Sequence, residues 1–313
     1  MEPTVRITRE RLTSLCPLRS EEGHKGTFGR LLLYAGTEGM GGAAYMAASS
    51  ALRSGVGLVY LLVPKELIAP LMTMCPEALT IPIPKKTADG AVLQPLVAVA
   101  PREEPAWLPE ALQGKDAVLL GPGIAPERRD VRENLPVMLR MVPHLVLDAG
   151  AISILASEPS LWEEIRTRRQ RGLGPVILTP HIGEFLRIFP EWTRGDMEAA
   201  SAWAREQETI LVLKSHQTNI FTPDGKWYSN QESNSGLAKG GSGDVLAGLL
   251  AGFLAQGMSE EDASVCAVGI HSLAGRLCVE EHGRRAMLPT MLWHYYDRCF
   301  KILNWEEGME NDG

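Results

Sequence analysis

The chain has 313 residues, of which 45% are hydrophobic and 22% are charged, and its formal net charge is −7. This composition is typical of a globular protein that is long enough to bury a large core. The mild acidity argues against nucleic-acid binding, which requires a basic face. No apolar run reaches the roughly 18–20 residues of a membrane span, so we expect neither a nucleic-acid nor a membrane partner.

The cysteines also limit the class of protein. The chain has 5 of them, and they are widely scattered, with no spacing typical of a zinc site. The first twenty residues contain no long apolar stretch after their charges, which predicts no signal peptide. We therefore expect a reducing, cytoplasmic location.

The first half of the chain predicts an α/β unit. A short helix is expected over residues 7–16, and buried strands are expected over residues 30–36 and 55–63. Between these strands, alanines recur at helical spacing from Ala44 to Ala51, which predicts a helix packed closely against a neighbour. One strand, helix and strand within about 35 residues favours a parallel, right-handed arrangement.

The same stretch contains a weak dinucleotide-binding fingerprint. Gly39, Gly41 and Ala44 fit the pattern G-x-G-x-x-A after a strand, and Glu66 follows at a suitable distance. Glu66 comes after Pro64 and Lys65, however, and so favours the start of a helix over the end of a strand. A nicotinamide-dependent dehydrogenase is the function that this pattern would indicate, and it ranks last here.

Further strands alternate with helices along the rest of the chain. Residues 64–115 are rich in proline and predict little, whereas strands are expected over residues 116–123, 144–148, 175–184 and 210–218, with a hairpin around residues 219–228. A capped helix is expected from Ser259 to Gly283 and a last amphipathic helix over residues 289–303. We predict an α/β fold, a three-layer αβα sandwich with a mostly parallel central sheet. It forms one domain over residues 1–313, with an uneven acidic tail at about 304–313.

A glycine-rich loop that leads into an apolar helix is the strongest functional signal. Gly236, Gly240, Gly241 and Gly243 allow the backbone to bend so that N–H groups converge on one point. The helix is expected to begin near Asp244 and to end at about residue 257. Because a helix N-terminus carries unpaired N–H donors and partial positive charge, this loop predicts an anion site.

Two polar residues near this site each have two interpretations. Asp244 either caps the helix or accepts a proton from a substrate hydroxyl that attacks a phosphoryl group. Lys214, at the end of a predicted strand, either extends its amine to water or meets a phosphate. The residues alone leave both questions open.

The loop sequence GGSGDVLAG resembles the GGTGDVLAG signature of the NAD(P)H-hydrate dehydratases, a branch of the ribokinase-like superfamily. Further segments resemble this family in the expected order: KGTFGRLLLYAGTEGMGGAAYMAASSALRSGVGLV, GPG at residues 121–123 and TPHIGEF at residues 179–185. The resemblance covers the chain from Lys25 to about Ala274 and is weakest over residues 64–115.

The resemblance implies a ribokinase-like fold and an enzyme, a carbon–oxygen lyase. Its reaction is the ADP- or ATP-dependent dehydration of the S epimer of hydrated NADH or NADPH, with Mg²⁺. It implies that the substrate contacts Ala43, Gly123, His181 and Asp244, with Asp244 as general base. The implied nucleotide-binding residues are Lys214, Ser215, His216, Gln217, Thr218, Gly240, Gly241 and Gly243. Glu184 either caps the following helix or helps to hold magnesium through water. A homo-oligomer, a tetramer in this family, and cooperation with an NAD(P)H-hydrate epimerase are also implied.

Three positions depart from the family pattern. Gly150 replaces the second acid of a DADAL segment, Ser215 replaces a glycine after the nucleotide-strand lysine, and Lys239 replaces a threonine in the glycine-rich loop. Lys239 either strengthens phosphate binding or faces solvent. These departures keep two rivals open: a vitamin-precursor kinase of the same fold, and a nucleotide-binding relative without turnover. The choices of ADP or ATP, and of hydrated NADH or NADPH, also stay open.

Overall fold

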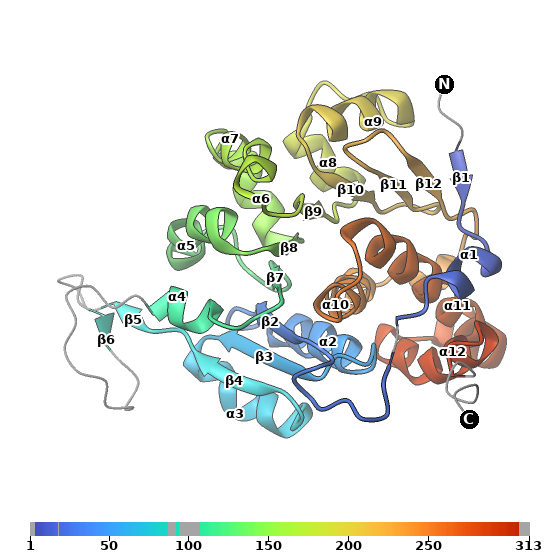
Figure 1. Ribbon diagram of the computed structural model, residues 1–313, viewed down its shortest axis with the longest axis horizontal. Helices are drawn as coiled ribbons and strands as arrows, with labels where there is room; N and C mark the ends of the chain where they lie inside the picture. The colour runs from blue at the N-terminus through green and yellow to red at the C-terminus, as the bar shows by residue number, and fades with distance from the viewer. Residues whose placement is uncertain (1–3, 18, 87–91, 94–106, 307–313) are drawn as a thin grey trace.

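The computed structural model describes residues 4–17, 19–86, 92–93 and 107–306, and its centre is a twisted sheet (Figure 1). Within the described residues this sheet has ten strands in the order β1-β12-β11-β10-β9-β8-β7-β2-β3-β4. Neighbouring strands pair in parallel except at β10–β11 and β11–β12. The predicted mostly parallel α/β fold is confirmed.

The strands are short and those in the middle of the sheet are buried on both faces, which explains their continuous apolar sequences. The sheet consists of β1 (Thr4–Arg6), β2 (Arg30–Tyr34), β3 (Leu58–Val63), β4 (Leu79–Pro82), β7 (Ala117–Leu120), β8 (His144–Leu147), β9 (Ile177–Leu178), β10 (Ile210–Leu213), β11 (Asn219–Phe221) and β12 (Trp227–Ser229). A separate pair is formed by β5 (Lys85–Lys86) and β6 (Val92–Leu93).

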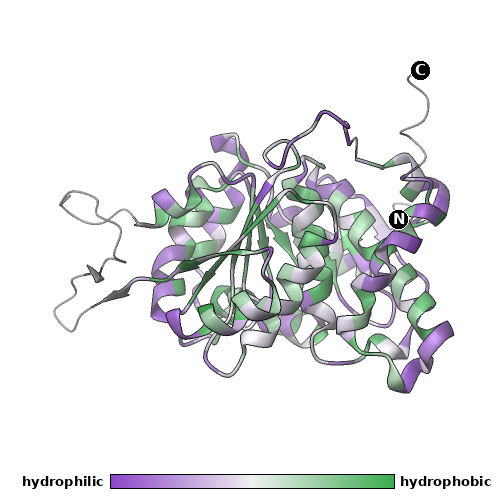
Figure 2. Ribbon diagram, turned by 90° about the horizontal axis from the view of Figure 1, so that it is seen from below, coloured by the Kyte–Doolittle hydropathy of each residue, from purple (hydrophilic) through white to green (hydrophobic). Residues whose placement is uncertain are grey.

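Helices cover both faces of the sheet, each over its own hydrophobic cluster. One face carries α1 (Arg9–Ser14), α2 (Gly41–Leu52), α3 (Lys65–Met74), the 3-10 helix η2 (Ser235–Leu237), α10 (Ser242–Ala255), α11 (Glu260–Ala286), the 3-10 helix η3 (Pro289–Tyr295) and α12 (Tyr296–Ile302). The other face carries α4 (Trp107–Leu112), α5 (Arg129–Met141), α6 (Gly150–Ser157), α7 (Leu161–Arg166), the 3-10 helix η1 (Arg169–Arg171), α8 (Ile182–Ile188) and α9 (Met197–Glu206). Figure 2 shows the hydrophobic strands in the middle and hydrophilic residues on the outer helices.

The closest helix packing joins α2 to α10, the helix that follows the glycine-rich loop. A side chain at Gly248 of α10 would place its Cβ 2.1 Å from the carbonyl oxygen of Ala47 in α2. The small residues of both helices therefore let the two backbones touch, and Ala44, Ala47 and Ala51 are fully buried. The alanine-rich helix belongs to the interior of this chain.

Several element boundaries differ from the sequence-based predictions. Residues 289–303 form a 3-10 helix followed by a short α-helix, where one amphipathic helix was expected. Strand β1 lies within the N-terminal stretch that predicted only a helix. Helix α11 passes Gly283, where the backbone turns to a φ of 75°, and ends at Ala286.

Two further predictions concern the chain as a whole. Among the described residues, no helix combines the length and apolarity needed to cross a membrane. The acidic tail at about 304–313 lies largely outside the described residues, as do residues 87–91 and 94–106 of the proline-rich stretch over residues 64–115.

Candidate active site

Three neighbouring parallel strands bring polar side chains together at their carboxyl ends. Asp148 follows β8, Thr179 follows β9 and Lys214 follows β10. The Oδ1 of Asp148 accepts hydrogen bonds from Lys214 Nζ at 2.8 Å and from Thr179 Oγ1 at 2.7 Å. The Asp148 side chain is only 2% exposed and that of Lys214 is 18% exposed, so the carboxylate end of this ion pair is buried. Such a pair requires good geometry to offset the cost of desolvation.

The glycine-rich loop lies directly against this ion pair. A Cβ added at Gly243 would lie 3.0 Å from Lys214 Nζ, so the absence of a side chain there makes room for the ammonium group. Burial alone would lower the pKa of Lys214, but the negative charges of Asp148, Glu184 and Asp244 outweigh it and raise the pKa. Lys214 therefore stays charged among three carboxyl groups.

Asp244 belongs to the same cluster and has an unusual proton affinity. Burial raises the pKa of Asp244 to about 7, and the charges of Asp148 and Glu184 add to this effect while Lys214 opposes it. A carboxylate whose pKa lies near neutral pH is suited to accept a proton during catalysis. This property is the clearest chemical feature of the site.

The helix-capping interpretation of Asp244 is wrong. Helix α10 begins at Ser242, its N-cap is Gly241 with a φ of 99°, and Asp244 lies within the first turn. Asp244 therefore sits one turn further into the helix than a capping residue would. Its carboxylate is thus left to the charged cluster.

The glycines of the loop have different surroundings. The positive φ of Gly241 is a conformation that glycine adopts without strain, and a Cβ there would lie 2.4 Å from Met46 Sδ. Gly240 has no atom within 4 Å of its missing side chain and so faces open space. Because first-turn N–H groups lack a carbonyl partner one turn earlier, those of Gly243 and Asp244 are available at this opening.

His181 and Glu184 are held by a capping box at the start of α8. The imidazole Nδ1 of His181 accepts from the N–H groups of Gly183 and Glu184, while Glu184 Oε2 accepts from the N–H of His181 at 2.9 Å. The His181 side chain is 57% exposed, and a parallel bridge joins its backbone to that of Lys214. His181 thus lies at the open side of the cluster and Glu184 at its buried side.

The predicted substrate residues Ala43 and Gly123 are in direct contact. A Cβ at Gly123, whose φ is 64°, would lie 2.5 Å from the carbonyl oxygen of Met40 and 2.9 Å from the Cβ of Ala43. No local pattern indicated that Arg128 braces this turn. Its Nη1 donates to the carbonyl oxygen of Gly36 at 2.9 Å, while its other nitrogens bind Asp130.

The segment from Ser215 to Thr218 forms a partly exposed turn after Lys214. Ser215 Oγ donates to the carbonyl oxygen of Gln217 at 2.6 Å, and His216 and Gln217 are exposed. The carbonyl oxygen of Thr218 accepts from the N–H of Asn230 at 3.0 Å, which ties the turn to the strand hairpin. Lys214 itself points the other way, toward Asp148.

The departures at Gly150 and Lys239 have structural explanations. A Cβ at Gly150 would lie 2.1 Å from the carbonyl oxygen of Ile124, so this backbone leaves no space for an acidic side chain. Lys239 Nζ donates to the carbonyl oxygens of Arg285, at 2.7 Å, and Met287. Its charge is therefore directed at the main chain at the C-terminal end of α11, which neither of the two expected roles anticipated.

A magnesium ion fits this site only together with phosphate oxygens. No group of three His, Cys, Asp or Glu side chains in the described part of the chain is arranged to hold a metal. Asp148 already binds Lys214 and Thr179, and Glu184 accepts from His181. A metal that keeps most of its waters and binds nucleotide phosphates matches these limits.

Comparison with known proteins agrees with this architecture. The sequence profile described as NAD(P)H-hydrate dehydratase matches residues 31–298, so the chain belongs to the NAD(P)H-hydrate dehydratase family. The ADP-dependent (S)-NAD(P)H-hydrate dehydratase of Bacillus subtilis is 33% identical over 94% of this chain and 97% of its own length.

A crystal structure of the B. subtilis ADP/ATP-dependent NAD(P)H-hydrate dehydratase, co-crystallised with ATP and Mg²⁺, superimposes with a TM-score of 0.78. The two chains are 31% identical, over 97% of this chain and all of the other. The expected ribokinase-like fold is thereby confirmed. A bifunctional NAD(P)H-hydrate repair enzyme from Moorella thermoacetica is 34% identical over 95% of this chain, which spans only 53% of that protein.

Proposed function

We propose that this protein is an ADP- or ATP-dependent dehydratase, a carbon–oxygen lyase, that restores NADH or NADPH from the S epimer of its hydrated form. The observation that carries the proposal is the partly buried carboxyl group of Asp244, whose pKa is raised to about 7 by desolvation and the charge of Asp148, in the first turn of α10. Family membership supplies the substrate class.

The reaction has two stages. Asp244 takes the proton from the hydroxyl group on the hydrated nicotinamide ring, and the hydroxyl oxygen forms a bond to the terminal phosphorus of the nucleotide. The bond from that phosphorus to the bridging oxygen breaks, and ADP leaves as AMP, or ATP as ADP. The phosphate then leaves the ring with the electrons of its C–O bond, and loss of one ring proton restores the double bond.

The surrounding residues assist the first stage. The free N–H groups at the start of α10 and the helix dipole stabilise charge on the transferred phosphoryl group. Lys214 balances the carboxylates of Asp148 and Asp244, so that Asp244 can lose its proton near neutral pH. Magnesium bound to the phosphates neutralises part of their charge, and Glu184 is the side chain proposed to hold it through water.

The remaining predictions complete the proposal. Ala43, Gly123 and His181 would contact the hydrated dinucleotide. The turn Ser215–Thr218, with Gly240, Gly241 and Gly243, would contact the nucleotide. A homo-oligomer, a separate epimerase partner and a reducing cytoplasm are also proposed. The match to about half of a bifunctional enzyme supports the epimerase, and five free cysteines support the reducing compartment.

The test is the recovery of NADH absorbance from hydrated NADH with ADP and Mg²⁺. We expect recovery with the unaltered protein and a loss of about a hundredfold or more with Asp244→Ala. Asp196→Ala, at the exposed N-cap of α9, is the matched carboxylate control and should keep full activity. Full activity of Asp244→Ala would contradict the assigned role. A stable phosphorylated alcohol without NADH recovery would favour a kinase of the same fold.

A further inference from the structure

Helix α11 lies along the glycine-rich loop and contacts it at several points. A Cβ at Gly275 of α11 would lie 3.1 Å from both Asn234 Nδ2 and Leu237 at the start of the loop. Beyond the other end of the loop, His271 Nε2 lies 3.1 Å from the carbonyl oxygen of Ser242. Between these points Lys239 binds carbonyl oxygens at the C-terminal end of α11, those of Arg285 and Met287. The loop is therefore held to α11 at its start, at Lys239 and just beyond its end.

His271 is the member of this set nearest to the chemistry. It is 8% exposed, on the buried side of α11, and its pKa is lowered to about 4, mainly by burial. The imidazole is therefore neutral at neutral pH. Because a carbonyl oxygen only accepts hydrogen bonds, Nε2 carries the hydrogen and donates it to Ser242.

The position of Ser242 gives this hydrogen bond its significance. Ser242 is the first residue of α10, and Asp244 lies in the same helical turn. The neighbouring Gly243 allows close contact with Lys214, whose charge also acts on His271. A shift of this first turn would move the carboxylate of Asp244 and the free N–H groups relative to the charged cluster. Displacements of about 1 Å in a catalytic group can cost a hundredfold in rate.

We propose that His271 is a positioning residue, which holds the first turn of α10 through its hydrogen bond to the Ser242 carbonyl and so sets the place of Asp244. This inference rests on the proposed function for the role of Asp244. It predicts that the N–H donor is what matters at position 271, and that the imidazole ring and its charge are not required.

Three substitutions at position 271 test separately the N–H donor, the length of the side chain and its volume. The amide nitrogen of His271→Gln extends about as far as Nε2 and can donate to Ser242. His271→Asn carries the same amide one carbon shorter and cannot reach it, and His271→Leu fills the space without a donor. We expect kcat within about threefold of the unaltered protein for the Gln variant, and a fall of about tenfold to a hundredfold for the Asn and Leu variants. The KM for hydrated NADH should change little, because the turn around Ala43 is untouched.

A second readout does not depend on turnover. Hydrogen exchange at the bonded amides of Ser242 and Val245, which donate to the carbonyl oxygens of Lys239 and Gly241, should be slow in the unaltered protein and the Gln variant and faster in the other two, at matched thermal stability. The proposal is overturned if all three variants keep the original kcat, or if the Gln variant falls as far as the Leu variant. If the unaltered protein does not restore NADH, the proposed function fails. Hydrogen exchange then decides on the positioning role alone, and equal rates in all four proteins would overturn it.

Discussion

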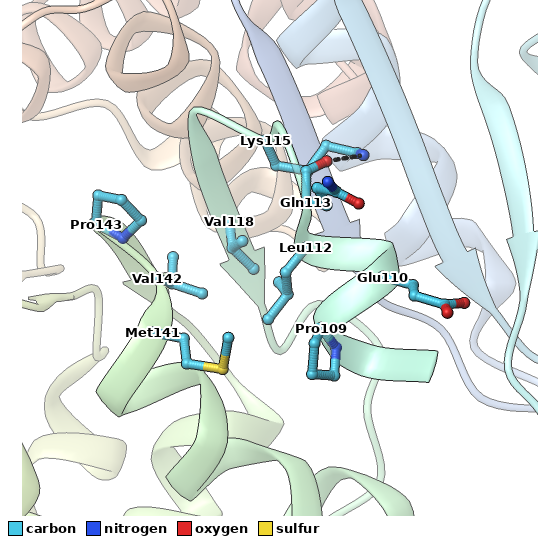
Figure 3. A pocket seen from close by; sticks show the side chains of 9 residues that line it. All are labelled: Pro109, Glu110, Leu112, Gln113, Lys115, Val118, Met141, Val142 and Pro143. Atoms are coloured by element: carbon cyan, nitrogen blue, oxygen red, sulfur yellow. Dashed lines mark hydrogen bonds between the residues drawn. The ribbon is translucent and has the colours of Figure 1, made fainter. Parts of the chain in front are cut away.

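The parallel strands of the central sheet end in two different environments, called here the carboxyl edge and the amino edge. Charged side chains have different partners at these two edges. At the carboxyl edge, Asp148, Lys214, Glu184 and Asp244 interact so strongly that the pKa of Asp244, already raised by burial, reaches about 7. At the amino edge, an open and mostly apolar groove of about 440 Å³ lies between α4, the start of β7 and the end of α5. Figure 3 shows the apolar side chains that line it and the Lys115 amine bound to the carbonyl oxygen of Gln113.

The buried cation beside the amino-edge groove shows what this difference means. Arg168 is fully buried and donates to the carbonyl oxygens of Val142, Pro143 and Gly174 at 2.7–3.1 Å, and also to that of Leu139. Its hydrogen bonds end on the backbone, so it stabilises the fold. At the carboxyl edge, charged side chains instead interact with one another. This arrangement suits catalysis at a cost in stability.

The largest expected effect is at Asp244. Asp244→Asn should lower kcat by about a hundredfold to ten-thousandfold, because the general base is lost. Since the pKa of Asp244 is raised by burial, this group stabilises the fold fully only below its unfolded pKa, and the stability is lost as pH rises through about 7. The variant should therefore be the more stable protein at pH 8, by about 1–3 kcal/mol, and thermal melting at pH 4 and pH 8 measures this. If the variant differed from the unaltered protein by the same amount at pH 4 and at pH 8, a raised pKa of Asp244 would be contradicted.

The next largest effect should follow removal of the central cation. Lys214→Met leaves the buried Asp148 without its partner, which should cost about 3–5 kcal/mol in unfolding free energy. Because Lys214 lowers the pKa of Asp244, its removal should also move the acid limb of kcat/KM to higher pH. Denaturant titration and a pH–rate profile measure the two effects. If the acid limb did not move, Lys214 would have no effect on the pKa of Asp244.

The amino edge should respond in stability alone. Arg168→Met deprives four carbonyl oxygens of a donor and should lower the unfolding free energy by about 2–4 kcal/mol. The kcat of the folded fraction should stay unchanged at a temperature well below the melting point. A changed pH–rate profile in this variant would show that Arg168 also affects catalysis, and would contradict the difference between the two edges.

The smallest effect concerns the turn after Asp148. Ala149 has a φ of 45° and a ψ of −110°, which is a strained backbone for a residue with a side chain. Ala149→Gly should therefore raise the unfolding free energy by about 0.5–1.5 kcal/mol. Ala151→Gly, in the adjoining helical turn, is the matched control and should destabilise by about 1 kcal/mol. Destabilisation by both substitutions would remove the argument for strain.

Much of the fold could be predicted because local patterns determine it. The apolar runs at β2, β3 and β8 mark strands buried on both faces, and the glycines before α10 mark an anion-binding turn. The hairpin of β11 and β12 followed from its turn residues. The strands, the hairpin and the loop-to-helix junction depend on neighbours in sequence and could be predicted from it, whereas anion binding at that junction stays a prediction.

The missed features depend on contacts between distant segments. Asp148 and Lys214 are separated by 66 positions and pair only because β8, β9 and β10 are neighbours in the sheet. The hydrogen bond from Lys239 to the carbonyl oxygen of Met287 likewise could not be predicted without knowing where α11 ends in space. No local pattern placed His271 beside Ser242, or Ile124 against Gly150.

The pH dependence of kcat/KM for NADH recovery tests the account most directly, because it reports the free enzyme. We predict that the rate rises with pH to a midpoint near 7, and that Asp148→Asn lowers this midpoint by removing a charge that raises the pKa of Asp244. A profile that is flat from pH 5 to pH 8, or the same midpoint in both proteins, would contradict Asp244 as the base tuned by this cluster.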